Sequence, residues 1–233
     1  MNEELKKLRQ LTKAGLMDCK KALEVSENFD EAIKYLQKRG MAKVEKRLGN
    51  ETKEGAVVVS HDEDNCVMML WKVETDFVAQ NEDFCSFINN ESMLFLKAED
   101  KASFIVSDEF QIRIKNISAK IGENVVCDKH CSFSLKDCAY NIYFHGILNE
   151  KFDNIAKVGV VLLVQKGDPT ILKNISANIA AYKLLELNVT ENISKENALS
   201  EQTYLFDSSL KIKDFLIKED IKILNYYLFF VEN

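Results

Sequence analysis

Glycine and proline are scarce in this chain, which has eight glycines and one proline among 233 residues. The glycines as placed form neither G-x-x-x-x-G-K-[ST] nor G-x-G-x-x-G, the two loops whose backbone N–H groups cradle phosphates. Hydrophobic residues make up 46% of the chain and charged residues 29%, a composition too apolar for a disordered protein. The sequence therefore predicts a globular protein of one or two domains, without a phosphate-binding loop of its own.

An excess of positive charge and long hydrophobic runs are also missing. The net charge of −6 argues against a protein that wraps nucleic acid, which needs a basic surface. No stretch reaches the roughly 18 unbroken apolar residues of a membrane helix. The first residues lack the apolar segment of a secretory signal and the arginines of a mitochondrial one. We therefore expect a cytoplasmic protein that makes no direct contact with nucleic acid or membrane.

Residues for a catalytic site are few. There are three histidines, and none lies in an H-E-x-x-H motif or near a G-x-S-x-G motif. Cys127, His130, Cys131 and Cys138 are four possible zinc ligands, but their segment alternates like a strand, so neighbouring side chains point to opposite faces. A zinc- or cysteine-dependent enzyme stays open as an alternative. The residues favour a binding protein without catalytic residues, cofactor or metal of its own.

The first fifty residues predict a small bundle of three short helices. Asp18 is a suitable N-cap for a helix from Cys19 to Val25, and Asp30 for the next helix. Gly40 stands where a glycine commonly ends a helix, and residues 41–48 predict a further basic amphipathic helix. Such a bundle is too small to be very stable alone.

Strands and helices alternate irregularly after the bundle, which is typical of an α+β fold. We expect a helical domain at 1–50, a first core subdomain at 51–138 and a second at 139–233, each subdomain with a small antiparallel sheet. The predicted strands are 56–59 and 66–71 (a hairpin), 140–144, 158–165, 204–206 and 221–231, and the predicted helices lie around 84–95, 110–121, 169–182 and 210–218.

Three stretches show more than the periodicity of helices and strands. They are L-R-Q-L-T-K-A-G-L-M-D-C-K-K-A-L at 8–23, E-T-D-F-V-A at 74–79 and A-K-I-G-E-N at 119–124. Together, in this order and spacing, they resemble the elongation factor Ts family, whose L-R-x-x-T-x-x-G-x-M-D-C-K-K-A-L signature the first stretch matches at nearly every fixed position. The resemblance covers most of the chain. It implies a ubiquitin-associated-like N-terminal bundle and a guanine nucleotide exchange factor for elongation factor Tu.

The resemblance also implies how the second stretch meets that partner. Asp76 and Phe77, flanked by Thr75 and Val78, occupy the positions of the family's pair that enters the G domain of elongation factor Tu. The phenylalanine wedges near the magnesium and phosphate site, magnesium loses its ligand geometry, and GDP leaves. Magnesium and GDP are bound by the partner, so no cofactor is expected here. On residues alone, Asp76 could equally cap a helix and Phe77 could lie in the core.

Two further contacts follow from the resemblance. Met17 matches a position that contacts the G domain, although a methionine there could also pack in a core. His145 stands where the second subdomain of the family meets its partner.

Departures from the family concern the segment before T-D-F and the second half of the chain. The glutamate and asparagine that usually begin the segment before T-D-F are absent from L-W-K-V-E at 70–74. The family's long helical hairpin, its coiled-coil motif, has room only at about 194–201, so we expect it to be deleted. This shortening leaves open a ubiquitin-associated-like adaptor that has lost exchange activity.

Overall fold

The structure, a computed structural model, describes residues 3–12, 14–190 and 192–232. The chain divides into two units, each built from several segments. The first combines Met1–Gly55, Lys72–Phe87 and Ala98–Val126, and the second combines Ala56–Trp71, Ile88–Lys97 and Cys127–Asn233. The predicted α+β class is confirmed, while the domain boundaries after residues 50 and 138 stay predictions.

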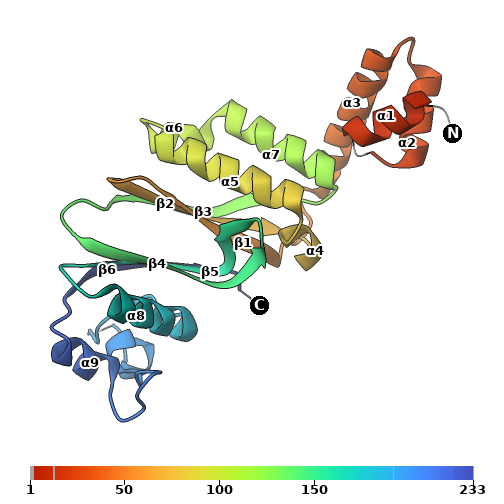
Figure 1. Ribbon diagram of the computed structural model, residues 1–233. Helices are drawn as coiled ribbons and strands as arrows, with labels where there is room; N and C mark the ends of the chain where they lie inside the picture. Colours follow the sequence, from red (N-terminus) through yellow and green to blue (C-terminus); the bar gives the residue numbers. More distant parts are fainter. Residues whose placement is uncertain (1–2, 13, 191, 233) are drawn as a thin grey trace. The chain divides into compact units, whose positions relative to one another are not determined.

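Three helices open the first unit, as predicted: α1 (Glu3–Thr12), α2 (Leu16–Val25) and α3 (Phe29–Arg47) (Figure 1). Their shared interior includes two alanines and a cysteine, small side chains that let short helices approach closely. The buried members are Leu8, Cys19, Ala22, Ala32 and Leu36.

The start of α2 differs from the prediction. The helix begins at Leu16 rather than Cys19, with Gly15 at the N-cap position and no side-chain cap. Asp18 lies inside the first turn, where a carboxylate is favoured by the helix dipole. Its carboxylate pairs with Arg39 at 3.5 Å, so this residue connects two helices instead of capping one.

The predicted break at Gly40 is also wrong, because α3 continues through it. A Cβ built on Gly40 would lie 3.1 Å from the Cβ of Ala119 in α7 (Asp108–Ile121), so the glycine allows a close contact between two helices instead of ending one.

The start of α3 also differs from the prediction, because the predicted cap Asp30 lies within the helix. Asn28 caps it instead, since its side-chain oxygen accepts a backbone N–H at 2.9 Å.

Among the described residues, three further helices and the beginning of a fourth belong to the first unit. They are α4 (Asp76–Ala79), the beginning of α5 (Glu82–Lys97), α6 (Lys101–Val106) and α7. The short helix α6, capped by the Asp100 side chain, was not predicted. The predicted stop of α7 is confirmed, because Gly122 takes the left-handed conformation at φ 82° that L side chains rarely adopt.

One six-stranded antiparallel sheet forms the second unit, in place of the two small sheets that were predicted. The long strand β5 pairs along one edge with β4, and along the other first with β1 at residues 155–156 and then with β6 at residues 158–164. A strand of 13 residues can join both halves in this way. The strands are β1 (Glu54–His61), β2 (Asn65–Val73), β3 (Val126–Ser134), β4 (Ala139–Asn149), β5 (Phe152–Val164) and β6 (Ile223–Phe230).

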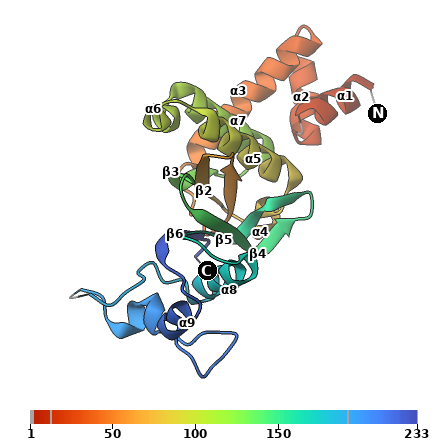
Figure 2. The ribbon, with the colours of Figure 1, turned by 60° about the vertical axis from the view of Figure 1, so that its left-hand side comes forward.

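Both faces of β5 are buried, which explains its continuous apolar sequence. Val160 and Leu162 lie in a cluster with α8 (Pro169–Tyr182) and α9 (Ile212–Lys218). Val161 and Leu163 point to the other face, where they pack with side chains of β1 and β2. Figures 1 and 2 show α8 packed against the part of the sheet that β4 and β5 form. As predicted, a helix begins at the only proline. Its cap, the Asp168 side chain, was not predicted.

The segment between α8 and α9 consists of loops with two short 3₁₀ turns, Lys195–Asn197 and Leu199–Glu201. Over 183–190 and 192–211, the described residues contain no α-helix. The predicted strand at 204–206 is wrong, since Tyr204 is buried in a turn with its ring stacked on Phe215 at 3.9 Å.

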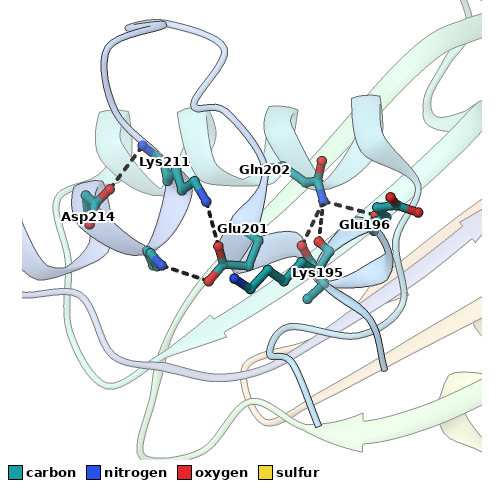
Figure 3. A network of polar contacts seen from close by, with 8 residues as sticks. Lys195, Glu196, Glu201, Gln202, Lys211 and Asp214 are labelled. Atoms are coloured by element: carbon teal, nitrogen blue, oxygen red, sulfur yellow. Dashed lines mark hydrogen bonds and ion pairs between the residues drawn. The ribbon is translucent and has the colours of Figure 1, made fainter. Parts of the chain in front are cut away.

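A polar network holds this segment together (Figure 3). The Glu201 carboxylate pairs with Lys211 at 2.7 Å and with Lys213 at 2.8 Å. The side-chain amide of the next residue, Gln202, donates to the carbonyl oxygens of Lys195, Glu196 and Ala198 at 3.0–3.1 Å. Hydrogen bonds from Lys211 and Lys213 lower the pKa of Glu201 to about 2, from an ordinary value of 4.5.

The lowered pKa of Glu201 predicts a defined pH dependence. A group whose folded-state pKa is depressed stabilises the fold above its unfolded pKa, and that contribution disappears as the pH falls toward the folded value. We expect Glu201→Gln to lower the free energy of unfolding at pH 7, with a difference from wild type that shrinks between pH 4.5 and about 2. Urea unfolding across this range measures it.

Glu196→Gln is the matched control, because Glu196 enters the network through its carbonyl oxygen. A wild-type-minus-Glu201→Gln difference that stays constant from pH 7 to pH 2 would show that the two lysines do not stabilise the carboxylate.

Candidate functional site

A four-residue helix presents the T-D-F-V-A stretch. Thr75 caps α4, because its Oγ1 accepts the backbone N–H of Val78 at 3.4 Å. Asp76 is exposed in the first turn, and Phe77 is 83% exposed. Val78 is half-buried, and Ala79 is fully buried and fixes the other end of the turn. The simpler interpretations are therefore wrong: the cap is Thr75 instead of Asp76, and Phe77 is not a core residue.

Two carboxylates attach this turn to the end of α7. Glu123 accepts the backbone N–H groups of Glu74 and Thr75 at 3.1 and 3.0 Å and the Thr75 hydroxyl at 2.6 Å. Glu74 in turn accepts the backbone N–H of Asn124 at 2.6 Å and the side-chain amide of Asn50 at 3.0 Å. Asn124 closes the arrangement by donating to the Asn50 carbonyl at 3.2 Å. We call this set of residues, 50, 74, 75, 123 and 124, the carboxylate clamp.

An exposed phenylalanine on a fixed turn is suited to binding a protein. A large apolar side chain in water gains free energy only when a partner buries it, and aromatic anchors commonly dominate such interfaces. The hydrogen-bonded backbone on both sides of Phe77 means that little conformational freedom is left to lose on binding.

Met17 is also solvent-exposed, at 73%, in the first turn of α2. Thr12 at the end of α1 binds the backbone on both sides of it: its hydroxyl donates to the Leu8 carbonyl at 2.7 Å and accepts the Ala14 N–H at 3.3 Å. Cys19, two residues after Met17, is fully buried and donates to the Ala14 carbonyl at 3.5 Å. Thus the cysteine takes the core position of this motif and Met17 faces solvent.

His145 belongs to the second unit, whereas Met17 and the Phe77 turn belong to the first. It is exposed on β4, opposite Val158 of β5. Together with Tyr143, Lys157 and Lys183 it lines a hollow of about 600 Å³. Three side chains that carry or can carry positive charge therefore surround this opening.

The four possible zinc ligands, all of them described residues, are not grouped as a metal site. Cys131 and Cys138 pack against the core of the second unit, and the His130 ring lies edge-on to Phe95 at 5.6 Å. Burial raises the pKa of Cys127 and Cys131 to about 12, which disfavours the thiolate that binds metal or attacks substrates. Within the described part of the chain, no three His, Cys, Asp or Glu residues are grouped as metal ligands would be.

The sequence indicated Phe77 but not the residues that hold it. Glu74 and Glu123 lie within the second and third motifs, but the motifs do not show that these segments meet. The contacts of Glu74, Glu123 and Asn50 join positions 24 to 50 residues apart. The available signal was the third motif, A-K-I-G-E-N at 119–124. In the structure, the glutamate of this motif, Glu123, accepts a hydrogen bond from Thr75 in the turn that carries Phe77.

No helix among the described residues combines the length and apolarity needed to cross a membrane.

Comparison with known proteins identifies a matching family and several relatives of this chain. Residues 74–192 match the family described as Elongation factor TS. A relative named Elongation factor Ts from Streptomyces griseus is 31% identical over 214 residues, 86% of this chain and 75% of the relative. One from Deinococcus radiodurans is 34% identical over 78% of this chain and 68% of the relative. One from Aquifex aeolicus is 37% identical, but the match spans 62% of this chain and only 55% of that relative.

Proposed function

Because the chain belongs to the elongation factor Ts family, we propose that it is a guanine nucleotide exchange factor for elongation factor Tu in the bacterial cytoplasm. The observation that carries the proposal is Phe77, which is 83% exposed on a turn held by the carboxylate clamp. A factor of this kind needs no catalytic residue and no cofactor, since the magnesium and GDP on which it acts are bound by the partner.

In the proposed mechanism, Asp76 and Phe77 enter the G domain of elongation factor Tu near the magnesium and phosphate site. Burying one phenylalanine contributes about 1.5–3 kcal/mol. Coupling free energies between two binding sites are typically about 1–3 kcal/mol, or about 5- to 150-fold in affinity. A single wedging side chain is therefore large enough to account for a substantial loss of GDP affinity, provided that its burial requires the GDP-free geometry of the partner.

Thermodynamic reciprocity gives the test of this function. If the chain lowers the affinity of elongation factor Tu for GDP, then GDP lowers the affinity of elongation factor Tu for the chain by the same factor. Titration calorimetry with the cognate elongation factor Tu, with and without saturating GDP, measures the affinity of the chain for this partner in both conditions. We expect at least tenfold weaker binding in GDP. Equal affinities in both conditions would instead support the adaptor that has lost exchange activity.

Met17 is proposed to contact the G domain from the N-terminal bundle. We expect Met17→Ala to weaken binding to nucleotide-free elongation factor Tu by about 5- to 20-fold, because a methionine that is 73% exposed in the free protein gains burial only in the complex. Calorimetry of the two proteins gives the affinity. Val25→Ala, an exposed apolar residue at the other end of the same helix, serves as control. Equal affinities of both variants and wild type for elongation factor Tu would show that Met17 does not lie in the interface.

The second unit is proposed to make a further contact with elongation factor Tu through His145 and the hollow that it lines. Charge complementarity favours acidic or hydrogen-bond-accepting groups of the partner there, because Lys157 and Lys183 lie at the same opening. We also propose that the family's helical hairpin is missing between α8 and α9, so that contacts made through it are lost. The loops closed by the Glu201 network occupy that position in the chain.

A further inference from the structure

The direction of Phe77 is set by groups outside its own helix. An isolated helix needs about 12–15 residues to be even marginally stable in water, and α4 has four. The side chain of Phe77 is 83% exposed, so it contributes little packing that could orient it. The buried Ala79 fixes the far end of the turn, and its beginning is therefore positioned by its backbone contacts and by Thr75.

Glu123 makes most of the side-chain contacts to that backbone. Its carboxylate accepts three hydrogen bonds from Glu74 and Thr75, the two residues directly before α4. Hydrogen bonds to an ionised acceptor are about twice as strong as neutral ones. Because one of them comes from the Thr75 hydroxyl, whose oxygen also accepts the Val78 N–H, the carboxylate fixes the residue that caps α4.

Glu123 is itself held at a defined place. It follows Gly122, whose left-handed conformation ends α7 and whose N–H donates to the Ser118 carbonyl at 2.9 Å. On its other side, the Asn124 N–H donates to Glu74 at 2.6 Å, so the two segments exchange hydrogen bonds in both directions. The carboxylate thus connects a 14-residue helix to a four-residue one.

From this geometry we infer that Glu123 is a positioning residue for nucleotide exchange. It holds Thr75, and through it Phe77, in the orientation that enters the partner. Without Glu123, the turn samples other directions and must be ordered during binding, which weakens the step that displaces GDP. The inference rests on the proposed exchange function, and it assigns to Glu123 no contact with the partner itself.

The test compares Glu123→Ala and Glu123→Gln in stopped-flow release of a fluorescent GDP analogue from the cognate elongation factor Tu. Glutamine retains an oxygen for the two backbone N–H groups and an amide that can donate to the Thr75 hydroxyl, so we expect release within about threefold of wild type. Alanine removes all three bonds, and we expect the maximal release rate at saturating factor to fall about 10- to 100-fold. Lys120→Ala is the control, since it removes a neighbouring ion pair to Asp83 without touching the turn.

A double-mutant cycle separates positioning from general stability. If Glu123 acts through Phe77, then Glu123→Ala has no further effect on release once Phe77→Ala is present. If Glu123→Ala does not fold, Glu123→Asp replaces it in the cycle, because a side chain shorter by one methylene keeps the charge but not the three bonds. The inference would be overturned if Glu123→Ala slowed GDP release by the same factor with Phe77 and with Phe77→Ala. It would also be overturned if the Glu123→Ala single variant reached the wild-type maximal rate. No release by wild type would instead overturn the proposed function.

Discussion

Phe77→Ala is expected to lose most of its stimulation of GDP release, by roughly 10- to 150-fold, the equivalent of about 1.5–3 kcal/mol of lost side-chain burial. The same variant should unfold within about 0.5 kcal/mol of wild type, because the phenylalanine is 83% exposed in the free protein. Stopped-flow release and urea unfolding measure the two effects. This separation of function from stability is typical of a side chain that acts only in a complex.

Phe206→Ala provides the matched control for Phe77. Phe206 is 58% exposed and belongs to the loop before α9 in the other unit. Its removal should leave release unchanged. Phe77→Leu should give an intermediate rate, since leucine keeps apolar bulk but not the aromatic shape. If Phe77→Ala releases GDP as fast as wild type, another part of the surface displaces the nucleotide.

Gly159→Ala should lower the free energy of unfolding by about 1–3 kcal/mol, the usual cost of inserting a methyl group into a packed core. Gly159 lies in β5 between Phe144 of β4 and Phe229 of β6. A Cβ there would meet Val57 Cγ1 at 2.7 Å and Met68 Cε at 3.5 Å, so β1 and β5 can pack this closely only with glycine. Urea unfolding of the full chain measures the loss.

The physical cause can be tested by restoring the space. Val57→Ala removes the clashing Cγ1, so the double variant Val57→Ala/Gly159→Ala should lose less stability than the sum of the two single variants. Gly49→Ala, where an added Cβ would meet no atom within 4 Å, should be neutral or slightly stabilising. Simple additivity of the Val57 and Gly159 effects would show that steric crowding does not explain the glycine.

Features set by local sequence were predicted well. Pro169 begins α8 and Gly122 ends α7, because both residues act through their own φ angle. Gly40 was misinterpreted as a helix end, since the reason for that glycine is a neighbour 79 positions away, Ala119. The sharing of β5 between β1, β4 and β6 was missed for the same reason: strand pairing depends on residues far apart in sequence.

In the candidate site too, local features could be predicted from the sequence and contacts between distant residues could not. The motif around Phe77 could be located from sequence, but its exposure and its capping by Thr75 could not. The clamp residue Glu123 lies 48 positions from Thr75, and a glutamate after a helix-ending glycine has no local signal for such a contact. The structure therefore adds to the sequence the residues that hold the motif in place.

Release of GDP from elongation factor Tu is the proposed activity on which the other predictions for the partner depend. Its most direct test is the dissociation rate of a fluorescent GDP analogue from the cognate elongation factor Tu, followed by stopped flow at increasing concentrations of the wild-type chain. We expect a rate that rises with concentration and saturates well above the spontaneous rate. A rate that equals the spontaneous one at every concentration, under conditions where calorimetry shows that the complex forms, would contradict it.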